Sequence, residues 1–176
     1  SMFMSVVFPE TRFDGSIMIT ASHLPYNRNG LKFFNADGGL EHADITDLLE
    51  TAAVLSAGQA DISKVSKVDL ISLYAQSLCE KIRLGVKADD YDRPLAGLHI
   101  VVDAGNGAGG FFVRQVLEPL GADTAGSQFL EPDGMFPNHI PNPENKQAMD
   151  SVRAATVEHH ADMGIIFDTD VDRMSA

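Results

Sequence analysis

The feature that most constrains the fold is a buried-type strand that runs directly into a glycine-rich loop. Residues 98–103 form an apolar run rich in β-branched side chains, and the glycines follow over 104–110. Residues 110–120 then carry apolar side chains at helical spacing, as do residues 146–160, and a second buried-type strand is predicted at 163–168. Strands that alternate with helices in this order predict an α/β fold with right-handed crossovers.

The first half of the chain shows the same α/β character less regularly. Short strands are predicted at 5–8 and 16–20, and 31–34 is a further short strand or the entry to a helix. We expect a loop over 35–39, helices over 44–57 and 68–84, and a weak strand at 122–126. The charged segment 87–97 contains Pro94 and is the predicted boundary between two domains, 1–92 and 93–176.

Composition excludes several classes of protein. The 176 residues are 44% hydrophobic and carry a net charge of −12, so binding to a nucleic acid is not expected. No run approaches the roughly 18 apolar residues of a membrane span, and no secretory signal is visible at the start, which favours a cytoplasmic location. The single cysteine, Cys79, is interpreted as a small core residue.

Three aspartates follow the strand at 163–168 at alternate positions. Asp168, Asp170 and Asp172 can converge on one point, where their charges repel unless a hard cation such as Mg²⁺ or Ca²⁺ binds. In open α/β sheets, sites lie at the carboxyl ends of strands, which favours a metal here. A solvated acidic loop remains the alternative, whereas the residue order does not fit an EF-hand.

The glycine-rich loop offers a second candidate site. Gly105, Gly107 and Gly110 satisfy G-x-G-x-x-G between a strand and a helix, which is typical of a dinucleotide-binding α/β module. A tight turn with close packing of helix on strand explains the same glycines. A third candidate is the turn that holds Ser22, His23 and Lys32, although a serine needs an activating group before it becomes a nucleophile.

Taken together, five stretches resemble the α-D-phosphohexomutase family of phosphoglucomutases and phosphomannomutases. The family's T-A-S-H-N-P is TASHLP at 20–25, and its N-G-F-K is NGLK at 29–32. Its D-G-D-G-D-R is DTDVDR at 168–173, and V-V-D-x-x-N-G-A-G is VVDAGNGAG at 101–109. FPNHIPNPE at 136–144 is similar to the family's connection ahead of the metal strand. The resemblance implies two three-layer α/β/α domains with mixed, mainly parallel sheets.

The resemblance also implies a site. Ser22 would carry a phosphoryl group and, with Asp168, Asp170 and Asp172, would hold one Mg²⁺ per chain. Phosphate would pass between this serine and the 1- and 6-positions of a hexose phosphate, with glucose 1,6-bisphosphate as activator. The remaining catalytic residues implied are Lys32, as an acid–base or charge-stabilising group, with His23 and Arg173 around the serine. On this interpretation the loop from Gly105 to Gly110 is structural.

The chain departs from the family pattern at Leu24, which replaces an asparagine, and at Thr169 and Val171, which replace glycines. Because a β-branched residue resists positive φ, the aspartate loop is expected either to follow ordinary backbone angles or to be strained. Family members have four domains, so we expect this chain to be an N-terminal piece, an isomerase-class fragment with little or no turnover alone. The hexose that it handles and its oligomeric state are left open.

Overall fold

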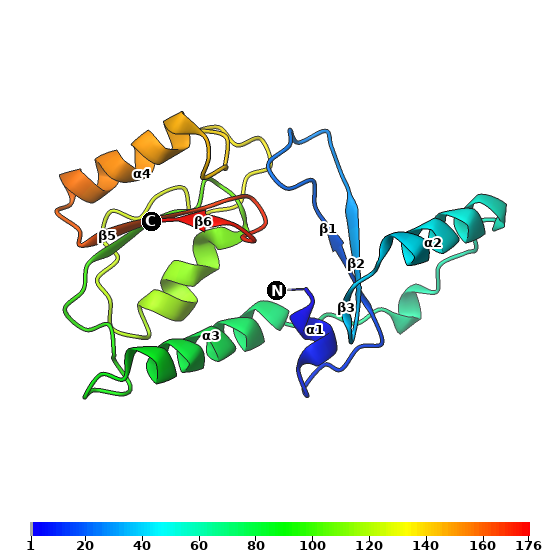
Figure 1. Ribbon diagram of the computed structural model, residues 1–176, viewed down its shortest axis with the longest axis horizontal. Helices are drawn as coiled ribbons and strands as arrows, with labels where there is room; N and C mark the ends of the chain where they lie inside the picture. The colour runs from blue at the N-terminus through cyan, green and yellow to red at the C-terminus, as the bar shows by residue number, and fades with distance from the viewer. Residues whose placement is uncertain (1) are drawn as a thin grey trace. The chain divides into compact units, whose positions relative to one another are not determined.

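The computed structural model describes residues 2–176, and by its internal contacts the chain divides into two units (Figure 1). The first unit contains Ser1–Ile19 and Gly30–Leu70, and the second contains Thr20–Asn29 and Ile71–Ala176. The loop Thr20–Asn29, which links two strands of the first unit along the chain, therefore belongs to the second unit. The domain limits 1–92 and 93–176 stay a prediction.

The first unit is built on an antiparallel sheet of β1 (Ser16–Ile19), β2 (Leu31–Asn35) and β3 (Gly38–Gly39), in that order. The strands at 16–20 and 31–34 are confirmed, but β3 lies where a loop was expected. The Asn35 side chain accepts hydrogen bonds from the backbone N–H groups of Asp37 and Gly38, and this tight turn folds β3 back onto β2. Short connections favour antiparallel pairs, so this sheet is not mainly parallel as the resemblance implied.

The helices of the first unit are α1 (Met4–Val7), α2 (His42–Val54) and the short 3₁₀ helix η1 (Ile62–Lys64). The strand predicted at 5–8 is wrong, because a four-residue apolar run fits a buried helical turn equally well. The hydroxyl of Ser5 donates to the Met2 carbonyl and closes that turn at 2.7 Å. Pro9 then favours extended backbone at Phe8, where α1 ends.

The second unit contains the mixed sheet β4 (Ile100–Asp103), β5 (Met163–Phe167) and β6 (Met174–Ser175). β4 pairs with β5 in parallel, and β5 pairs with β6 as an antiparallel hairpin. The weak strand expected at 122–126 is present only as isolated parallel bridges, at His99–Asp123 and Asp103–Gln128.

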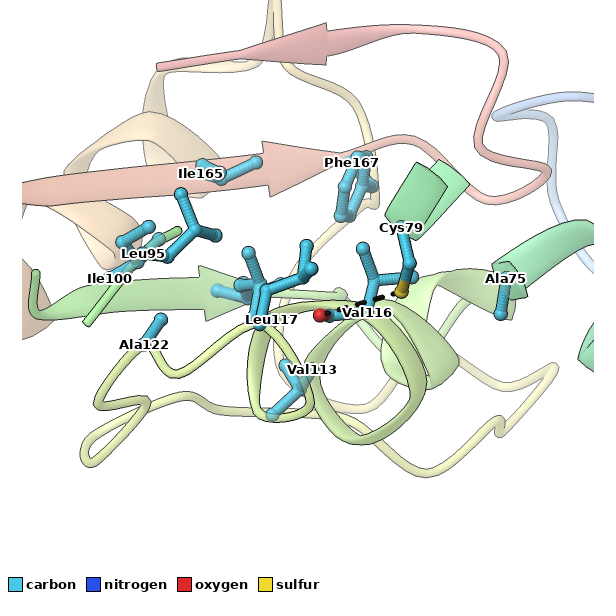
Figure 2. Packing of buried hydrophobic residues seen from close by; sticks show 12 residues of the cluster. Ala75, Cys79, Leu95, Ile100, Val113, Val116, Leu117, Ala122, Ile165 and Phe167 are labelled. Atoms are coloured by element: carbon cyan, nitrogen blue, oxygen red, sulfur yellow. Dashed lines mark hydrogen bonds between the residues drawn. The ribbon is translucent and has the colours of Figure 1, made fainter. Parts of the chain in front are cut away.

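Helices cover both faces of this sheet, so the second unit is a three-layer α/β/α structure (Figure 1). On one face α3 (Leu70–Val86) and the π-helical segment η3 (Val113–Leu117) pack on the sheet. β4 and the 3₁₀ helix η2 (Ala108–Gly110) lie between them along the chain. On the other face α4 (Lys146–Glu158) packs on Ile166. The larger apolar cluster lies on the α3 and η3 side, as Figure 2 shows.

The helix predicted at 110–120 contains a π-helical turn for a local reason. Pro119 has no backbone N–H, so it cannot donate to the Gln115 carbonyl one turn earlier. That carbonyl lies 3.4 Å from Sγ of Cys79 instead, and the Val116 carbonyl lies 3.8 Å from the same sulfur (Figure 2). Cys79 is buried, which confirms its interpretation as a core residue.

The α/β fold class is confirmed by the two sheets and their helices. Within residues 2–176, no helix combines the length and the apolar character that crossing a bilayer requires.

Candidate active site

The aspartate loop is a tight turn that joins β5 to β6. Asp168 follows β5 directly and is fully buried. Its Oδ1 accepts hydrogen bonds from the backbone N–H groups of Asp172 and Arg173, both at 3.1 Å. Its own backbone N–H donates to the Arg173 carbonyl at 3.1 Å. The first aspartate of the motif therefore fixes the backbone of the residues that follow it.

The three aspartates direct oxygen atoms toward one another. One carboxylate oxygen from each of Asp168, Asp170 and Asp172 lies within 4.8 Å of the other two. Burial raises the pKa of Asp168 to about 6, and the hydrogen bond with Asp172 and the nearby charge of Asp170 act in the same direction. Crowded carboxylates of this kind are stabilised by a hard cation that takes oxygen ligands, so these residues fit Mg²⁺.

Arg173 links this acidic loop to Ser22. Its Nη2 donates to Oγ of Ser22 at 2.9 Å, and its Nε donates to Oδ2 of Asp168 at 3.1 Å. The loop Thr20–Asn29 and the aspartate loop thus meet within the second unit, although Ser22 and Arg173 are about 150 residues apart in sequence. One guanidinium group contacts both the serine hydroxyl and the buried carboxylate.

His23 contacts both Arg173 and Ser22. Its Nδ1 lies 2.6 Å from Nη2 of Arg173 and 3.4 Å from Oγ of Ser22. A guanidinium group can only donate, so Nδ1 of His23 is the acceptor and carries no proton in this arrangement. The single lone pair of Nδ1 is therefore engaged by Arg173, and the serine hydroxyl lies beside this hydrogen bond.

Thr20 also belongs to this site, although the sequence analysis gave it no role beyond its places in the strand 16–20 and in TASHLP at 20–25. Its hydroxyl donates to Oδ2 of Asp170 at 2.9 Å and accepts the backbone N–H of Ser22, also at 2.9 Å. The signal in the sequence was its position two residues before the serine, from which a threonine hydroxyl can reach the N–H of Ser22.

The backbone is strained at both loops. Ser22 has φ +53° and Val171 has φ +61°, in the left-handed region that glycine prefers. Of the two alternatives for the aspartate loop, the strained one is therefore observed at Val171. Leu24, the third departure from the family pattern, is about half exposed and lines an apolar pocket with Met135 and Ile140.

The glycine-rich loop supports the aspartate loop. A Cβ atom on Gly107 would lie 2.8 Å from the Thr169 carbonyl oxygen, and one on Gly110 would lie 2.0 Å from that of Leu130. The N–H of Ala108 donates to the Thr169 carbonyl at 2.8 Å. Because the protein's own backbone occupies the space beside these glycines, close packing explains them and a pyrophosphate group is not needed to do so.

A buried polar network holds the end of β4. Asp103 accepts hydrogen bonds from Gln128, Ser151 and the backbone N–H of Gly105, and it pairs with Nε2 of His139 at 3.0 Å. Burial alone would lower the pKa of His139, but the hydrogen bonds to Asp103 and to the adjacent backbone carbonyl outweigh it, so the pKa is raised. Sequence reasoning did not identify this pair, whose members lie 36 residues apart.

Lys32, the remaining predicted site residue, lies on β2 in the first unit, opposite Met18 of β1. The structure thus brings together Ser22, His23, Arg173 and the three aspartates within the second unit, whereas Lys32 is described with the first unit.

Comparisons with known proteins give the same family for both halves of the chain. The family model for phosphoglucomutase/phosphomannomutase α/β/α domain I matches residues 3–56, and that for domain II matches residues 73–176. A phosphomannomutase of Salmonella montevideo is 35% identical over 91% of this chain, and a phosphomannomutase/phosphoglucomutase of Pseudomonas putida is 34% identical over 90%. The chain spans 35% and 32% of these relatives, about a third of their length.

A solved structure gives the same result for the fold. The crystal structure of a phosphoglucomutase/phosphomannomutase family protein from Burkholderia thailandensis superposes with a TM-score of 0.70 and 28% identity. The match covers 92% of this chain and 32% of that one. With the domain II model matching more than half of the residues, the chain belongs to the phosphoglucomutase/phosphomannomutase family.

Proposed function

We propose that this chain carries the phosphoryl-accepting serine and the metal-binding loop of a phosphohexomutase. The observation that carries the proposal is the double contact of Arg173, with Oγ of Ser22 at 2.9 Å and with Oδ2 of Asp168 at 3.1 Å. It joins a hydroxyl that can hold phosphate to carboxylates that can hold a cation. The curated relatives are phosphomannomutases, which favours hexose phosphates as the substrate class.

In the proposed reaction, phosphate passes from phosphorylated Ser22 to a free hydroxyl of the sugar phosphate. The P–Oγ bond breaks, a new P–O bond forms at the sugar, and the proton of the sugar hydroxyl ends on Oγ of Ser22. The bisphosphate then returns its other phosphate to Ser22, so phosphate moves between the 1- and 6-positions. By resemblance, Lys32 is the acid–base or charge-stabilising group near the reacting hydroxyl.

The residues beside the serine suit this transfer. Arg173 places positive charge 2.9 Å from Oγ of Ser22, where the negative charge of a phosphoryl group develops. Nδ1 of His23 accepts from Nη2 of Arg173 and lies 3.4 Å from Oγ of Ser22, so it helps to hold the guanidinium group at the serine. Asp168, Asp170 and Asp172 would hold Mg²⁺, which supplies further positive charge to the transferred group when bound.

Because the 176 residues span about a third of the curated relatives, we assign the complete interconversion to the longer family proteins. For this chain alone we expect only the second of these transfers, phosphorylation of Ser22 by the bisphosphate, with little or no turnover. The dinucleotide-binding alternative has no support from the comparisons, since the loop from Gly105 to Gly110 lies within the match to domain II.

The test is to incubate the chain with glucose 1,6-bisphosphate and Mg²⁺ and to map phosphate by mass spectrometry. We expect phosphate on Ser22, none without Mg²⁺, and none in Ser22→Ala. Ser63→Ala is the control, because Ser63 is an exposed serine whose hydroxyl contacts Asp61 rather than the Arg173 guanidinium group. Phosphate on another residue, with Ser22 bare, would contradict the proposal.

A second pair of variants tests the metal. Asp170→Asn should lower Mg²⁺-dependent phosphorylation at least tenfold, as expected when a metal ligand is lost, whereas Glu144→Gln, at an exposed acid outside the cluster, should not. A rise in melting temperature with Mg²⁺ and no phosphate on Ser22 would instead indicate a metal site that only stabilises the fold.

A further inference from the structure

The Thr20 hydroxyl connects the serine loop to the aspartate loop through two hydrogen bonds. Its oxygen accepts the backbone N–H of Ser22 at 2.9 Å, and its hydrogen is donated to Oδ2 of Asp170 at 2.9 Å. Thr20 and Asp170 are 150 residues apart in sequence, and both belong to the second unit. Arg173 links the same two loops through the side chain of Ser22, whereas Thr20 links them through its backbone.

The direction of both hydrogen bonds is fixed by chemistry. A backbone N–H can only donate, so the Thr20 oxygen must be the acceptor from Ser22. The single hydroxyl hydrogen is then available for Asp170, whose oxygen must accept it. A carboxylate has two oxygen atoms, so a hydrogen bond at Oδ2 is compatible with metal ligation by the same residue.

The position of the Ser22 N–H matters because this residue is strained. Its φ of +53° is unusual for a residue other than glycine and is retained only where the surroundings hold it. The hydrogen bond to Thr20 fixes the backbone N–H, and the hydrogen bond from Arg173 fixes the side-chain oxygen. A shift of the Asp170 carboxylate would therefore be transmitted to the backbone of Ser22 through one hydroxyl group.

We propose that Thr20 is a positioning residue that couples occupation of the aspartate cluster by Mg²⁺ to the conformation of Ser22. This inference rests on the proposed function for the identity of the metal. In this role Thr20 does not contact the substrate. The conservative variant Thr20→Ser keeps the hydroxyl, and Thr20→Val keeps the shape of the side chain without it.

The first test follows the backbone amide of Ser22 by NMR in the ¹⁵N-labelled chain. Without metal, Thr20→Val should move the Ser22 amide proton upfield, because that proton loses its acceptor, and Thr20→Ser should not. With added Mg²⁺, the Ser22 amide should shift in the original chain and in Thr20→Ser, but not in Thr20→Val. Equal responses in all three proteins would overturn the inference, as would a Thr20→Ser response as small as that of Thr20→Val.

The second test measures affinity for Mg²⁺ by calorimetry and phosphorylation of Ser22 by mass spectrometry. Thr20→Val should weaken both about tenfold, the lower end of the range for losing a residue that orients a metal ligand. Thr124→Val is the matched control, because the Thr124 hydroxyl also donates to a carboxylate, Glu118, at 3.1 Å on the exposed surface of the same unit. Thr124→Val should change neither quantity.

The experiments distinguish failure of the proposed function from failure of the Thr20 coupling. If the original chain takes no phosphate on Ser22 but its Ser22 amide responds to Mg²⁺ only when the Thr20 hydroxyl is present, the proposed function fails and the coupling stands. If Ser22 is phosphorylated equally in the original chain and in Thr20→Val, with equal melting temperatures, the proposed function stands and the coupling is wrong.

Discussion

At the scale of single residues, each of the two loops of the candidate site contains one residue with a strained backbone, Ser22 in one and Val171 in the other. Val171 has φ +61°, which its β-branched side chain opposes, while that side chain packs partly against the core of the second unit. Replacement by alanine removes the packing and keeps most of the strain, whereas replacement by glycine removes both. The two replacements therefore separate strain from packing.

We predict that Val171→Gly is more stable than Val171→Ala by about 1 kcal/mol, because glycine adopts positive φ without penalty. Urea unfolding of the two variants measures this difference. The control pair is Arg153→Gly and Arg153→Ala on the exposed face of α4, where alanine should be the more stable by about 1 kcal/mol. The same order at both positions would contradict a strained Val171.

His139 should make stability depend on pH. Its pKa is raised above the ordinary 6.5, because the hydrogen bonds to Asp103 and the Ile140 carbonyl outweigh the effect of burial. A group whose folded pKa is raised stabilises the fold fully below its unfolded pKa. The free energy of unfolding should therefore fall as pH rises from 6.5 through the higher folded value.

His139→Gln should remove this dependence and should cost about 3 kcal/mol at pH 6, because one partner of a buried pair is lost. Denaturant unfolding between pH 6 and pH 8.5 measures both effects. His42→Gln, at an exposed histidine on α2, is the control and should leave the slope unchanged. An unchanged slope in His139→Gln would show that other groups cause the dependence.

At the scale of elements, the glycine-rich loop packs directly against the aspartate loop. Gly107→Ala would place a methyl group 2.8 Å from the Thr169 carbonyl oxygen, so we expect a loss of about 2–4 kcal/mol and weaker Mg²⁺ binding. Gly134→Ala is the control, since nothing lies within 4 Å of its added Cβ, and it should change stability by less than about 0.5 kcal/mol. Thermal unfolding and calorimetry measure these effects.

The aspartate loop should bind Mg²⁺ in a pH-dependent way. Burial, with Asp172 and Asp170 nearby, raises the pKa of Asp168 from 3.8 to about 6. The folded chain therefore holds a proton that the unfolded chain has lost, and without metal its stability falls as pH rises from 3.8 through 6. Mg²⁺ requires the ionised carboxylate, so binding must release this proton.

We predict that the dissociation constant for Mg²⁺ rises about tenfold for each pH unit below 6 and is level above it. Calorimetry in buffers of different ionisation enthalpy measures the affinity and the proton released. An affinity that stays constant from pH 5 to pH 7 would contradict the raised pKa of Asp168.

Much of the fold was predictable where periodicity is sustained. The helices α2, α3 and α4 and the strands β4 and β5 agree with their apolar patterns. The short elements α1, β3 and β6 were not predictable, because they depend on local hydrogen bonds or on a partner strand. The π-helical turn depends on Pro119 and on the contact of the Gln115 carbonyl with Cys79, which lies 36 residues away in sequence.

The residues of the candidate site were predictable from two motifs, but the hydrogen bonds that connect these residues were not. The three aspartates stand out in the sequence because their alternate spacing suits a metal ion. Ser22 stands out because it lies in the TASHLP stretch. Thr20 and His139 do not, because a threonine at a strand end and a histidine in a proline-rich segment are common in structural roles. Their partners, Asp170 and Asp103, are identified only by the tertiary structure.

At the scale of the whole molecule, charge explains the composition of the site. The chain carries a net charge of −12, which opposes binding of a phosphorylated sugar. A phosphoserine adds a further −1.5 to −2 or so. Arg173 provides one positive charge at Ser22, and a cation among the three aspartates would provide two more. We therefore expect a divalent metal to be required before phosphate can be retained on Ser22.

The most direct measurement replaces Mg²⁺ by paramagnetic Mn²⁺ in the ¹⁵N-labelled chain and follows which amide signals broaden. The account predicts that the signals of Ser22 and of residues 168–173 broaden first and together, at the lowest metal concentration. Broadening of residues 168–173 with a sharp Ser22 signal, or broadening first at other acidic residues, would contradict a shared site for the serine and the metal.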